Sequence, residues 1–307
     1  MSGHIPVMLA EVLEALNPHD GAHYIDGTFG GGGYAKAILE ACDCRVLGID
    51  RDPDAIARGQ ALVALYPGRL TLVHGEFSQM DRLLADCGED GTNGVVLDLG
   101  VSSFQFDEPA RGFSFRADGP LDMRMSMSGE SAADVVNTAD AKTLAGIISR
   151  YGEEHHAMRI ARAIVAARPL TRTAELAEIV SKTLGPAAAR QPIHPATRTF
   201  QALRIHVNDE LGELATALEA ATRALKPQGR LAIVSFHSLE DRIVKHFLSE
   251  RSTAAPRASR HAPETRQASA SLYRLLASRP QSPGDGEIAN SPRARSAKLR
   301  AAERLAA

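Results

Sequence analysis

The sequence predicts an α/β protein whose mostly parallel sheet is interrupted by a helical insertion. Short apolar runs alternate with helical stretches in the first third of the chain, and a glycine-rich run follows the first of them. The alternation stops between about residues 107 and 208 and then returns. Strands that recur with helices between them form βαβ units, which build a parallel sheet. The sheet is therefore open and doubly wound, or it closes into a barrel.

Length and composition exclude several classes of protein. The 307 residues allow one large domain or two ordinary ones, and 44% hydrophobic with 23% charged residues excludes bulk disorder. No apolar run approaches the roughly 18 to 20 residues of a membrane span, and the start has no secretory signal, so we expect a soluble cytoplasmic protein with no membrane partner. Three cysteines without a second Cys/His pair at zinc spacing support neither a disulfide framework nor a structural zinc.

The charge is unevenly distributed along the chain. Residues 1–110 carry a net charge of −11 and residues 251–307 a net charge of +7, within a total of −2. A basic end on a nearly neutral protein suggests a polyanionic partner, because Lys and Arg near phosphates gain affinity by releasing counterions. A solvated arginine-rich tail explains the charge equally well.

The first third contains the elements of a parallel sheet. Pro53 suits the first turn of a helix over 53–65, and a second helix runs from the glycines to about Ala41. The predicted strands are His23–Asp26, Arg45–Asp50, Leu70–His74 and Gly94–Leu99.

The next hundred residues read as helices. Leu144, Ile147, Ile148 and Tyr151 fall at helical spacing, and a second such series ends at a Gly-Pro stop signal. We therefore predict a core over 1–106 and 209–307 with a helical domain inserted at 107–208.

The sheet pattern returns in the last third. A helix near 209–225 and a turn at 226–229 precede a strand at Leu231–Phe236. Residues 252–269 and 278–295 are rich in Ser, Pro, Ala and Arg and are predicted to be mobile loops. Leu272–Leu276 and Ala297–Leu305 are candidate closing strands, although the second also reads as a helix.

The run Asp26–Gly33, DGTFGGGG, lies between a predicted strand and helix. Glycines there let the backbone approach a ligand at a helix N-terminus, as in sites for NAD, FAD and S-adenosylmethionine, although a plain tight turn uses them too. Asp50 ends the second strand 23 residues beyond Gly27 (50 − 27), near the roughly 20-residue interval of an acid that binds ribose hydroxyls. A nucleoside cofactor is therefore predicted.

Two features favour S-adenosylmethionine. Asp26 directly precedes the glycines, where a carboxylate can lie near the cofactor's ammonium group or its waters. The end of the fourth predicted strand carries Asp98, followed closely by Ser102 and Ser103, with no His or Lys acid for hydride transfer. Asp98 or nearby carbonyls can orient an exocyclic amine for methyl transfer, with the two serines as orienters, or the serines merely cap the next turn. Methylation at a ring carbon is disfavoured because the motif contains no Cys.

Several blocks together resemble one bacterial family, the small-subunit ribosomal RNA methyltransferases that modify N4 of a decoding-site cytidine in 16S rRNA. The matching blocks are His4–Ala10, Tyr24–Gly33, Gly48–Pro53, Asp98–Gln105, Arg111–Met125, Tyr151–Ala163, His194–Asn208, Ser235–Phe247 and Asn290–Arg300. The resemblance implies a Rossmann-like class I methyltransferase with a helical insertion that uses S-adenosylmethionine and no metal.

Carried over by position, the resemblance implies a set of cofactor contacts and catalytic residues. The cofactor contacts would be Gly32, Gly33, Tyr34, Asp50, Phe77, Asp98 and Gln105, and Asp98, Ser102 and Ser103 would act in catalysis. Two departures stand out, since the family usually reads Gly-His-Ser at Gly33–Ala35 and Pro at Phe104. Backbone contacts would tolerate the first change, whereas the second can loosen the substrate loop.

Basic and aromatic residues in the matching blocks are candidates for gripping unstacked RNA. They are Arg111, Phe113, Phe115, Arg116, Arg124, Arg198 and His237. The same residues can instead form a packed lid or brace the pocket. The implied partner is 16S rRNA within the small ribosomal subunit, and the oligomeric state stays open, with a homodimer among the alternatives. Two rival functions are amino-methylation of another nucleic acid, DNA or RNA, and a non-catalytic RNA-binding assembly factor.

Overall fold

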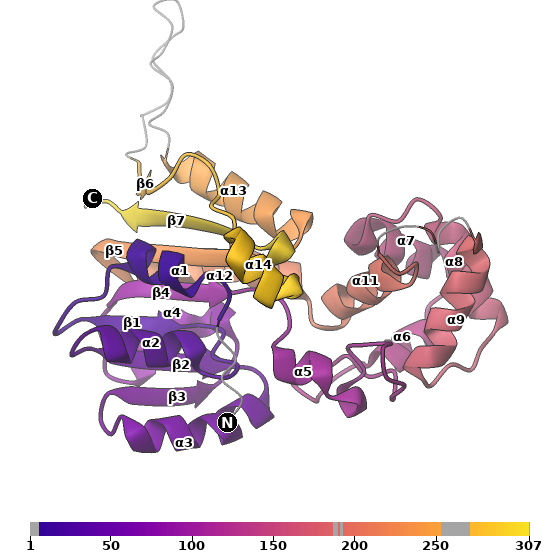
Figure 1. Cartoon of the computed structure of the whole chain (residues 1–307), viewed down its shortest axis with the longest axis horizontal. Helices are drawn as coiled ribbons and strands as arrows, with labels where there is room; N and C mark the ends of the chain where they lie inside the picture. The colour runs from indigo at the N-terminus through magenta and orange to yellow at the C-terminus, as the bar shows by residue number, and fades with distance from the viewer. Residues whose placement is uncertain (1–5, 187–189, 191–192, 253–270, 307) are drawn as a thin grey trace, which may run out of the picture. The chain divides into compact units, whose positions relative to one another are not determined.

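The computed structural model describes residues 6–186, 190, 193–252 and 271–306. The chain divides into two compact units, which are treated separately below (Figure 1). The first unit comprises Met1–Gly100 and Leu211–Ala307, and the second comprises Val101–Glu210. In the described parts of the chain, no helix combines the length and the apolar character that a membrane crossing requires.

The first unit is built on a seven-stranded sheet of order β3-β2-β1-β4-β5-β7-β6. The strands are β1 (His23–Asp26), β2 (Arg45–Asp50), β3 (Leu70–His74), β4 (Thr92–Asp98), β5 (Leu225–Ser235), β6 (Tyr273–Leu275) and β7 (Lys298–Arg304). Neighbours from β3 to β5 pair in parallel, whereas β7 is antiparallel to both β5 and β6. The sheet is open and lies between helices, so the predicted α/β class is confirmed and the barrel alternative is wrong.

The topology singles out the end of the sheet at which the parallel strands finish. β1 lies between β2 and β4, and the chain proceeds outward to β3 on one side and to β5 on the other. The strand order therefore reverses at β1 and β4, where α/β proteins bind ligands beyond the carboxyl ends of the strands. Asp26, Asp50 and Asp98 are the last residues of β1, β2 and β4. The strand register thus brings the three carboxylates to the same end of the sheet.

Helices cover both faces of the sheet (Figure 1). They are α1 (Leu9–Leu16), α2 (Gly33–Ala41), α3 (Pro53–Leu65), α4 (Met80–Asp86), α12 (Glu210–Ala224), α13 (Ser238–Ser252) and α14 (Asp285–Asn290), with the short helices η1 (Phe77–Gln79) and η3 (Pro292–Ser296). Alternate strand residues enter opposite cores: Tyr24 packs with α1 and α2, and Ile25 packs with α4, α12 and α13. A strand buried on both faces needs apolar residues at odd and at even positions, which explains the near-continuous apolar runs in the sequence.

The second unit is helical, as the spacing of its apolar residues predicts. Its helices are α5 (Ser103–Asp107), η2 (Pro109–Arg111), α6 (Ala132–Thr138), α7 (Ala141–Gly152), α8 (Ala157–Ala166), α9 (Thr173–Leu184) and α11 (Thr197–Val207). Its core includes Leu144 and Ile148 of α7, together with Leu176 and Val180 of α9. One isolated bridge joins Pro120 to Arg172, and no strand is assigned among the described residues of this unit.

Three predictions about the last third need correction or qualification. The strand begins at Leu225, and residues 226–229 form a bulge inside it, because Leu225 pairs with Thr92 whereas Arg230 already pairs with Gly94. Residues 278–295 are not simply a loop, since they contain α14 and most of η3. The second candidate closing strand is confirmed as β7, and the loop expected at 252–269 lies outside the described residues except for Ser252.

Candidate active site

The loop after β1 is fastened to the neighbouring strands by its own backbone and side chains. Asp26 is fully buried, and its two carboxylate oxygens accept hydrogen bonds from the backbone N–H groups of Thr28 and Ala35, at 3.3 and 3.1 Å. The Thr28 hydroxyl in turn accepts a hydrogen bond from the N–H of Asp98 at 2.7 Å. Burial raises the pKa of Asp26 to about 7. Asp26 therefore shapes the loop and α2, and Thr28, which the sequence analysis missed, ties the loop to β4.

Some of the glycines are required by packing within the protein itself. Gly32 has a φ of +74°, and a Cβ there would lie 2.7 Å from Cζ of Phe29. A Cβ on Gly33 would lie 2.3 Å from Cγ of Pro6. The loop therefore folds tightly against the N-terminus of α2, whose first N–H groups have no partner within the helix.

Asp50 is bound by the loops on either side of it. Its carboxylate accepts hydrogen bonds from the N–H groups of Gly30 at 2.7 Å and Asp52 at 2.8 Å. Burial raises its pKa, while these two hydrogen bonds act in the opposite direction. Each carboxylate oxygen has two lone pairs, so Asp50 keeps acceptor capacity for a pair of hydroxyl groups.

Asp98 has the most unusual environment of the three carboxylates. Its Oδ1 is buried and has no hydrogen-bond partner among the described residues. Burial raises the pKa of Asp98 well above its usual range, and the negative charges of Asp26 and Glu240 raise it further. A buried carboxylate oxygen without a partner costs free energy in the folded protein, which makes Asp98 a candidate functional residue.

Glu240 and His237 lie at the neighbouring carboxyl end of β5. Glu240 is 2% exposed, and its Oε2 accepts hydrogen bonds from the N–H groups of Phe236 at 2.8 Å and His237 at 3.2 Å. Its Oε1 lies 3.1 Å from Nε2 of His237. This pair orders the start of α13 beside Asp98. Glu240 was missed in the sequence, although an acidic residue three positions after a helix start is a recognisable capping signal.

Phe77 and Tyr34 differ in what they offer a ligand. Phe77 is half-buried, and its Cβ lies 3.3 Å from the position that a Cβ on Gly27 would take, so its ring is beside the glycine loop. Tyr34 is 3% exposed, and its hydroxyl donates a hydrogen bond to the carbonyl of Val7. The Tyr34 side chain is therefore part of the core, and only its backbone is available to a ligand.

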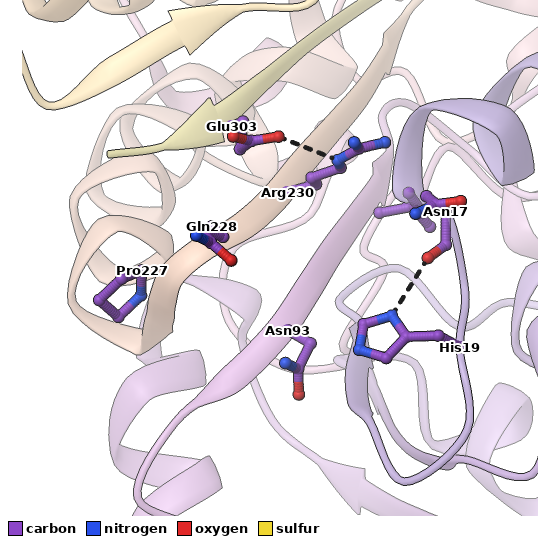
Figure 2. A pocket seen from close by; sticks show the side chains of 8 residues that line it. Asn17, His19, Asn93, Pro227, Gln228, Arg230 and Glu303 are labelled. Carbon is purple, nitrogen blue, oxygen red and sulfur yellow. Dashed lines mark hydrogen bonds and ion pairs between the residues drawn. The ribbon is translucent and has the colours of Figure 1, made fainter. Parts of the chain in front are cut away.

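A cavity of about 250 Å³ lies at the other end of the sheet from Asp26, Asp50 and Asp98 (Figure 2). Arg230 pairs there with Glu303 at 3.4 Å, and Nδ1 of His19 lies 3.3 Å from the carbonyl oxygen of Asn17. The lining residues are Leu16, Asn17, His19, Asn93, Pro227, Gln228, Arg230 and Glu303. The Arg230 guanidinium is paired with Glu303, and Asp26, Asp50 and Asp98 do not line the cavity. This cavity is therefore not the candidate site.

In the second unit, Ser102 and Gln105 form a reciprocal cap at the start of α5. The Ser102 hydroxyl accepts a hydrogen bond from the N–H of Gln105 at 3.3 Å, and Oε1 of Gln105 accepts one from the N–H of Ser102 at 3.2 Å. Ser103 is the first residue of the helix. The structure therefore shows the capping role that the sequence left open for Ser102, and Gln105 is 5% exposed.

Three of the RNA-binding candidates are engaged within the second unit. Arg111 is 7% exposed and donates to the carbonyls of Arg124 and Met125 at 3.0 and 2.9 Å. Arg124 donates to both oxygens of Asp122, at 2.9 and 2.6 Å. Phe113 belongs to the core. Arg111 therefore braces a loop, Arg124 is charge-compensated, and the Phe113 ring is not available to stack on a base.

Other candidates keep an accessible face. Phe115 is half-buried, and its ring centroid lies 4.6 Å from that of the exposed His194, with 34° between the planes. Arg116 is exposed, with its guanidinium carbon 6.0 Å from the ring centroid of Phe106. Arg198 is partly exposed and lies 3.7 Å from the buried Glu154. Phe115, Arg116 and Arg198 thus stay candidates for RNA contact.

Residues 1–305 match the model of the MraW methylase family. The chain belongs to this family. Among curated members of similar sequence, the ribosomal RNA small subunit methyltransferase H of Azorhizobium caulinodans is 60% identical over 304 residues, which cover 98% of this chain and 87% of that protein. The protein of the same name from Parvibaculum lavamentivorans is 57% identical over 312 residues, covering 100% of this chain and 91% of the relative.

Membership of the MraW methylase family confirms the resemblance read from the sequence. The chain is therefore a methylase, and it contains the mostly parallel sheet that the sequence predicts. Solved structures match it more distantly. An rRNA methylase from Streptococcus thermophilus aligns with a TM-score of 0.42 and 11% identity, covering 97% of this chain and 94% of that one.

Proposed function

We propose that this methylase transfers a methyl group from S-adenosylmethionine to the exocyclic N4 amine of a decoding-site cytidine in 16S rRNA of the small ribosomal subunit. The observation that carries the proposal is Asp98, a buried carboxylate with an unpartnered oxygen at the switch point of the sheet. The two relatives that carry the name ribosomal RNA small subunit methyltransferase H support the class of substrate.

The residues at the sheet edge fit S-adenosylmethionine. Asp50 would take the ribose hydroxyls, and Phe77 lies where it can pack on the adenine. The backbone of Gly32, Gly33 and Tyr34 would contact the cofactor at the start of α2, and Gln105 follows Asp98 along the chain as the remaining contact. The unpartnered Asp98 oxygen and the tight glycine loop are the features that support this fit. S-adenosylmethionine supplies an electrophilic methyl group when it is bound.

The protein's own contribution to the reaction is to orient the amine. The N4 lone pair of cytosine is delocalised into the ring, and an acceptor on the N–H groups releases it toward the methyl group. Asp98 serves as that acceptor when it is ionised, and it takes the proton that the amine loses. Ser102 and Ser103 keep only an orienting role, since Ser102 is already engaged in the cap of α5.

The substrate partner follows from the same proposal. The inserted helical unit, expected over 107–208, recognises the RNA, with Phe115 and His194 as a surface on which an unstacked base can lie. Phosphate contacts would come from Arg116 and Arg198. The enzyme then works in the cytoplasm, on assembled or nearly assembled small subunits, and needs no metal.

The test is methyl incorporation followed by nucleoside analysis. Purified protein is incubated with radiolabelled S-adenosylmethionine and small subunits that lack the modification, with free 16S rRNA and duplex DNA in parallel. We expect label in N4-methylcytidine at the decoding site, with small subunits as the preferred substrate. Label in another nucleoside or in DNA overturns the substrate, and cofactor binding without transfer to any nucleic acid makes the protein a binding factor.

A further inference from the structure

One group of helices in the second unit is strongly basic. α7, α8 and α11 together contain Lys142, Arg150, Arg159, Arg162, Arg198 and Arg204, and they contain no Asp or Glu. α7 contacts both α8 and α11. By contrast, α6 and α9 in the same unit contain acidic residues, and Lys182 of α9 pairs with Glu178 at 2.6 Å.

Half of these six cations are already compensated within the unit. Arg204 pairs with Glu210 at 2.7 Å, and Arg198 lies 3.7 Å from Glu154. Lys142 lies in the first turn of α7 beside its capping Asp140. Arg150, Arg159 and Arg162 are exposed, and none of them has an ion-pair partner among the residues that the structure describes. We call these three arginines, Arg150 of α7 and Arg159 and Arg162 of α8, the α8 basic surface.

The geometry of α8 fixes the direction of two of these arginines. Its buried side is formed by Ala157, Ile160, Ala161 and Ile164. At 100° per residue, Arg159 and Arg162 point to the opposite side of the helix, and a spacing of three residues places their Cβ atoms about 5–6 Å apart. The exposed Met158 lies on the same side. Arg150 is in the last turn of α7, nine residues before Arg159 along the chain.

Charge complementarity identifies the kind of partner. Guanidinium groups without ion-pair partners, on helices that contain no Asp or Glu, attract a polyanion, and arginine's fork of donors matches phosphate oxygens. The exposed Glu153, between α7 and α8, is the acidic residue nearest to them along the chain. We propose that the α8 basic surface binds the phosphate backbone of the substrate RNA. The inference rests on the proposed function for the identity of the RNA, but not for the existence of the surface. None of these three arginines was among the RNA contacts expected from the sequence.

The salt dependence of RNA binding tests the surface directly. The variant Arg159→Gln/Arg162→Gln keeps helix-forming residues at both exposed positions, so α8 should stay folded. Its matched control is Arg172→Gln/Lys182→Gln, which removes the same charge from exposed residues of the same unit that are ion-paired to Asp118 and Glu178. The full chain is titrated with an RNA hairpin carrying the decoding-site cytidine, and with small subunits, over a range of salt concentrations.

We expect the α8 variant to bind the hairpin about tenfold or more weakly, and its slope of log Kd against log salt to fall by about 1.5, for two lost phosphate contacts. The control should stay near wild type. Equal slopes for all three proteins, or an equal loss in the control, overturn the inference. Weaker binding to small subunits with unchanged hairpin binding also overturns it, because the partner is then a ribosomal protein. Failure of the proposed function is seen separately, as a wild-type protein that binds RNA but does not methylate it.

Discussion

Asp98 is the residue on which the proposed chemistry depends most directly. Its unpartnered oxygen is suited to accept a hydrogen bond from an amine, and no other carboxylate at the sheet edge is free in this way, because Asp26 and Asp50 bind backbone N–H groups. Replacing Asp98 by Asn or Ala should lower methyl transfer by about 100-fold or more, a loss typical of removing one oriented polar group from an active site. Single-turnover assays measure this, and an unchanged urea midpoint shows that the fold persists. Near-normal turnover in both variants would exclude the role.

Asp50 should act on cofactor affinity and not on the chemical step. Loss of a hydrogen bond to a charged acceptor costs about 1.5–3 kcal/mol, so Asp50→Ala should weaken binding of S-adenosylhomocysteine by about tenfold or more. The variant also loses two acceptor contacts to its own loops, which complicates a single measurement. Calorimetry with the 2′-deoxy analogue separates the two effects. Wild type should discriminate against the analogue and the variant should not. Equal discrimination by both proteins contradicts the ribose assignment.

Glu240 should set the pH at which Asp98 becomes an acceptor. Burial, Asp26 and Glu240 all raise the pKa of Asp98, and only the ionised carboxylate can take the proton that the amine loses, so kcat/KM should rise with pH through that pKa. Glu240→Gln removes one negative charge but keeps an acceptor for the N–H groups of Phe236 and His237. The acid limb of the profile should therefore move to lower pH. Glu250→Gln, on the exposed side of the same helix, should leave the limb in place, and a shift of equal size there would refute the interpretation.

At the scale of elements, the strand boundaries show how much of the fold the sequence predicts. β1, β2 and β3 begin and end at the predicted residues, because each apolar run has polar or glycine boundaries, and β1 and most of β2 are buried on both faces. The bulge in β5 could not be predicted, since Lys226-Pro227-Gln228-Gly229 has the composition of a turn and its pairing depends on β4. The same limit applies to α14, whose residues resemble a polar linker.

The glycine loop gives a prediction with an internal control. Gly32 and Gly68 have nearly equal positive φ values, of 74° and 72°, but a Cβ on Gly32 would meet Phe29 and Leu62 within 3 Å, whereas a Cβ on Gly68 would have nothing within 4 Å. Gly68→Ala should therefore cost only the backbone strain, about 1–2 kcal/mol, and Gly32→Ala about 1–3 kcal/mol more. Urea unfolding measures both. Equal losses would show that the contacts around Gly32 relax freely.

The candidate site shows a second limit of sequence reasoning. The positions of Asp26, Asp50 and Asp98 follow from strand ends, which the sequence shows. Which of Phe113 and Phe115 is buried does not, because the two are separated by one residue in a loop and differ only through tertiary packing. Arg111 is likewise taken up by carbonyls that lie thirteen and fourteen residues along the chain. The functional roles of these residues stay predictions.

For the whole molecule, the two units should respond separately to their two substrates. Each has its own core: the clusters that cover the sheet contain no residue of 101–210, and the helical cluster lies entirely within that segment. Cores of this kind can unfold in separate transitions. A ligand that binds only one folded unit stabilises that unit by about 2.7 kcal/mol at one hundred times its Kd.

S-adenosylhomocysteine should therefore raise the unfolding temperature of the sheet unit by several degrees and leave that of the helical unit nearly unchanged, because Gln105 is the single proposed cofactor contact in that unit. Hydrogen exchange assigns each change to its unit, with α7 and α8 reporting on one and β4 and β5 on the other. At the same ligand concentration the shift should fall to about half in Asp50→Ala, whose affinity is about tenfold lower, and persist in Arg159→Gln/Arg162→Gln. Equal stabilisation of both units by the cofactor would mean that the inserted helices contribute to cofactor binding, and Gln105, which follows Asp98 on the chain but belongs to the helical unit, would then be the first residue to replace.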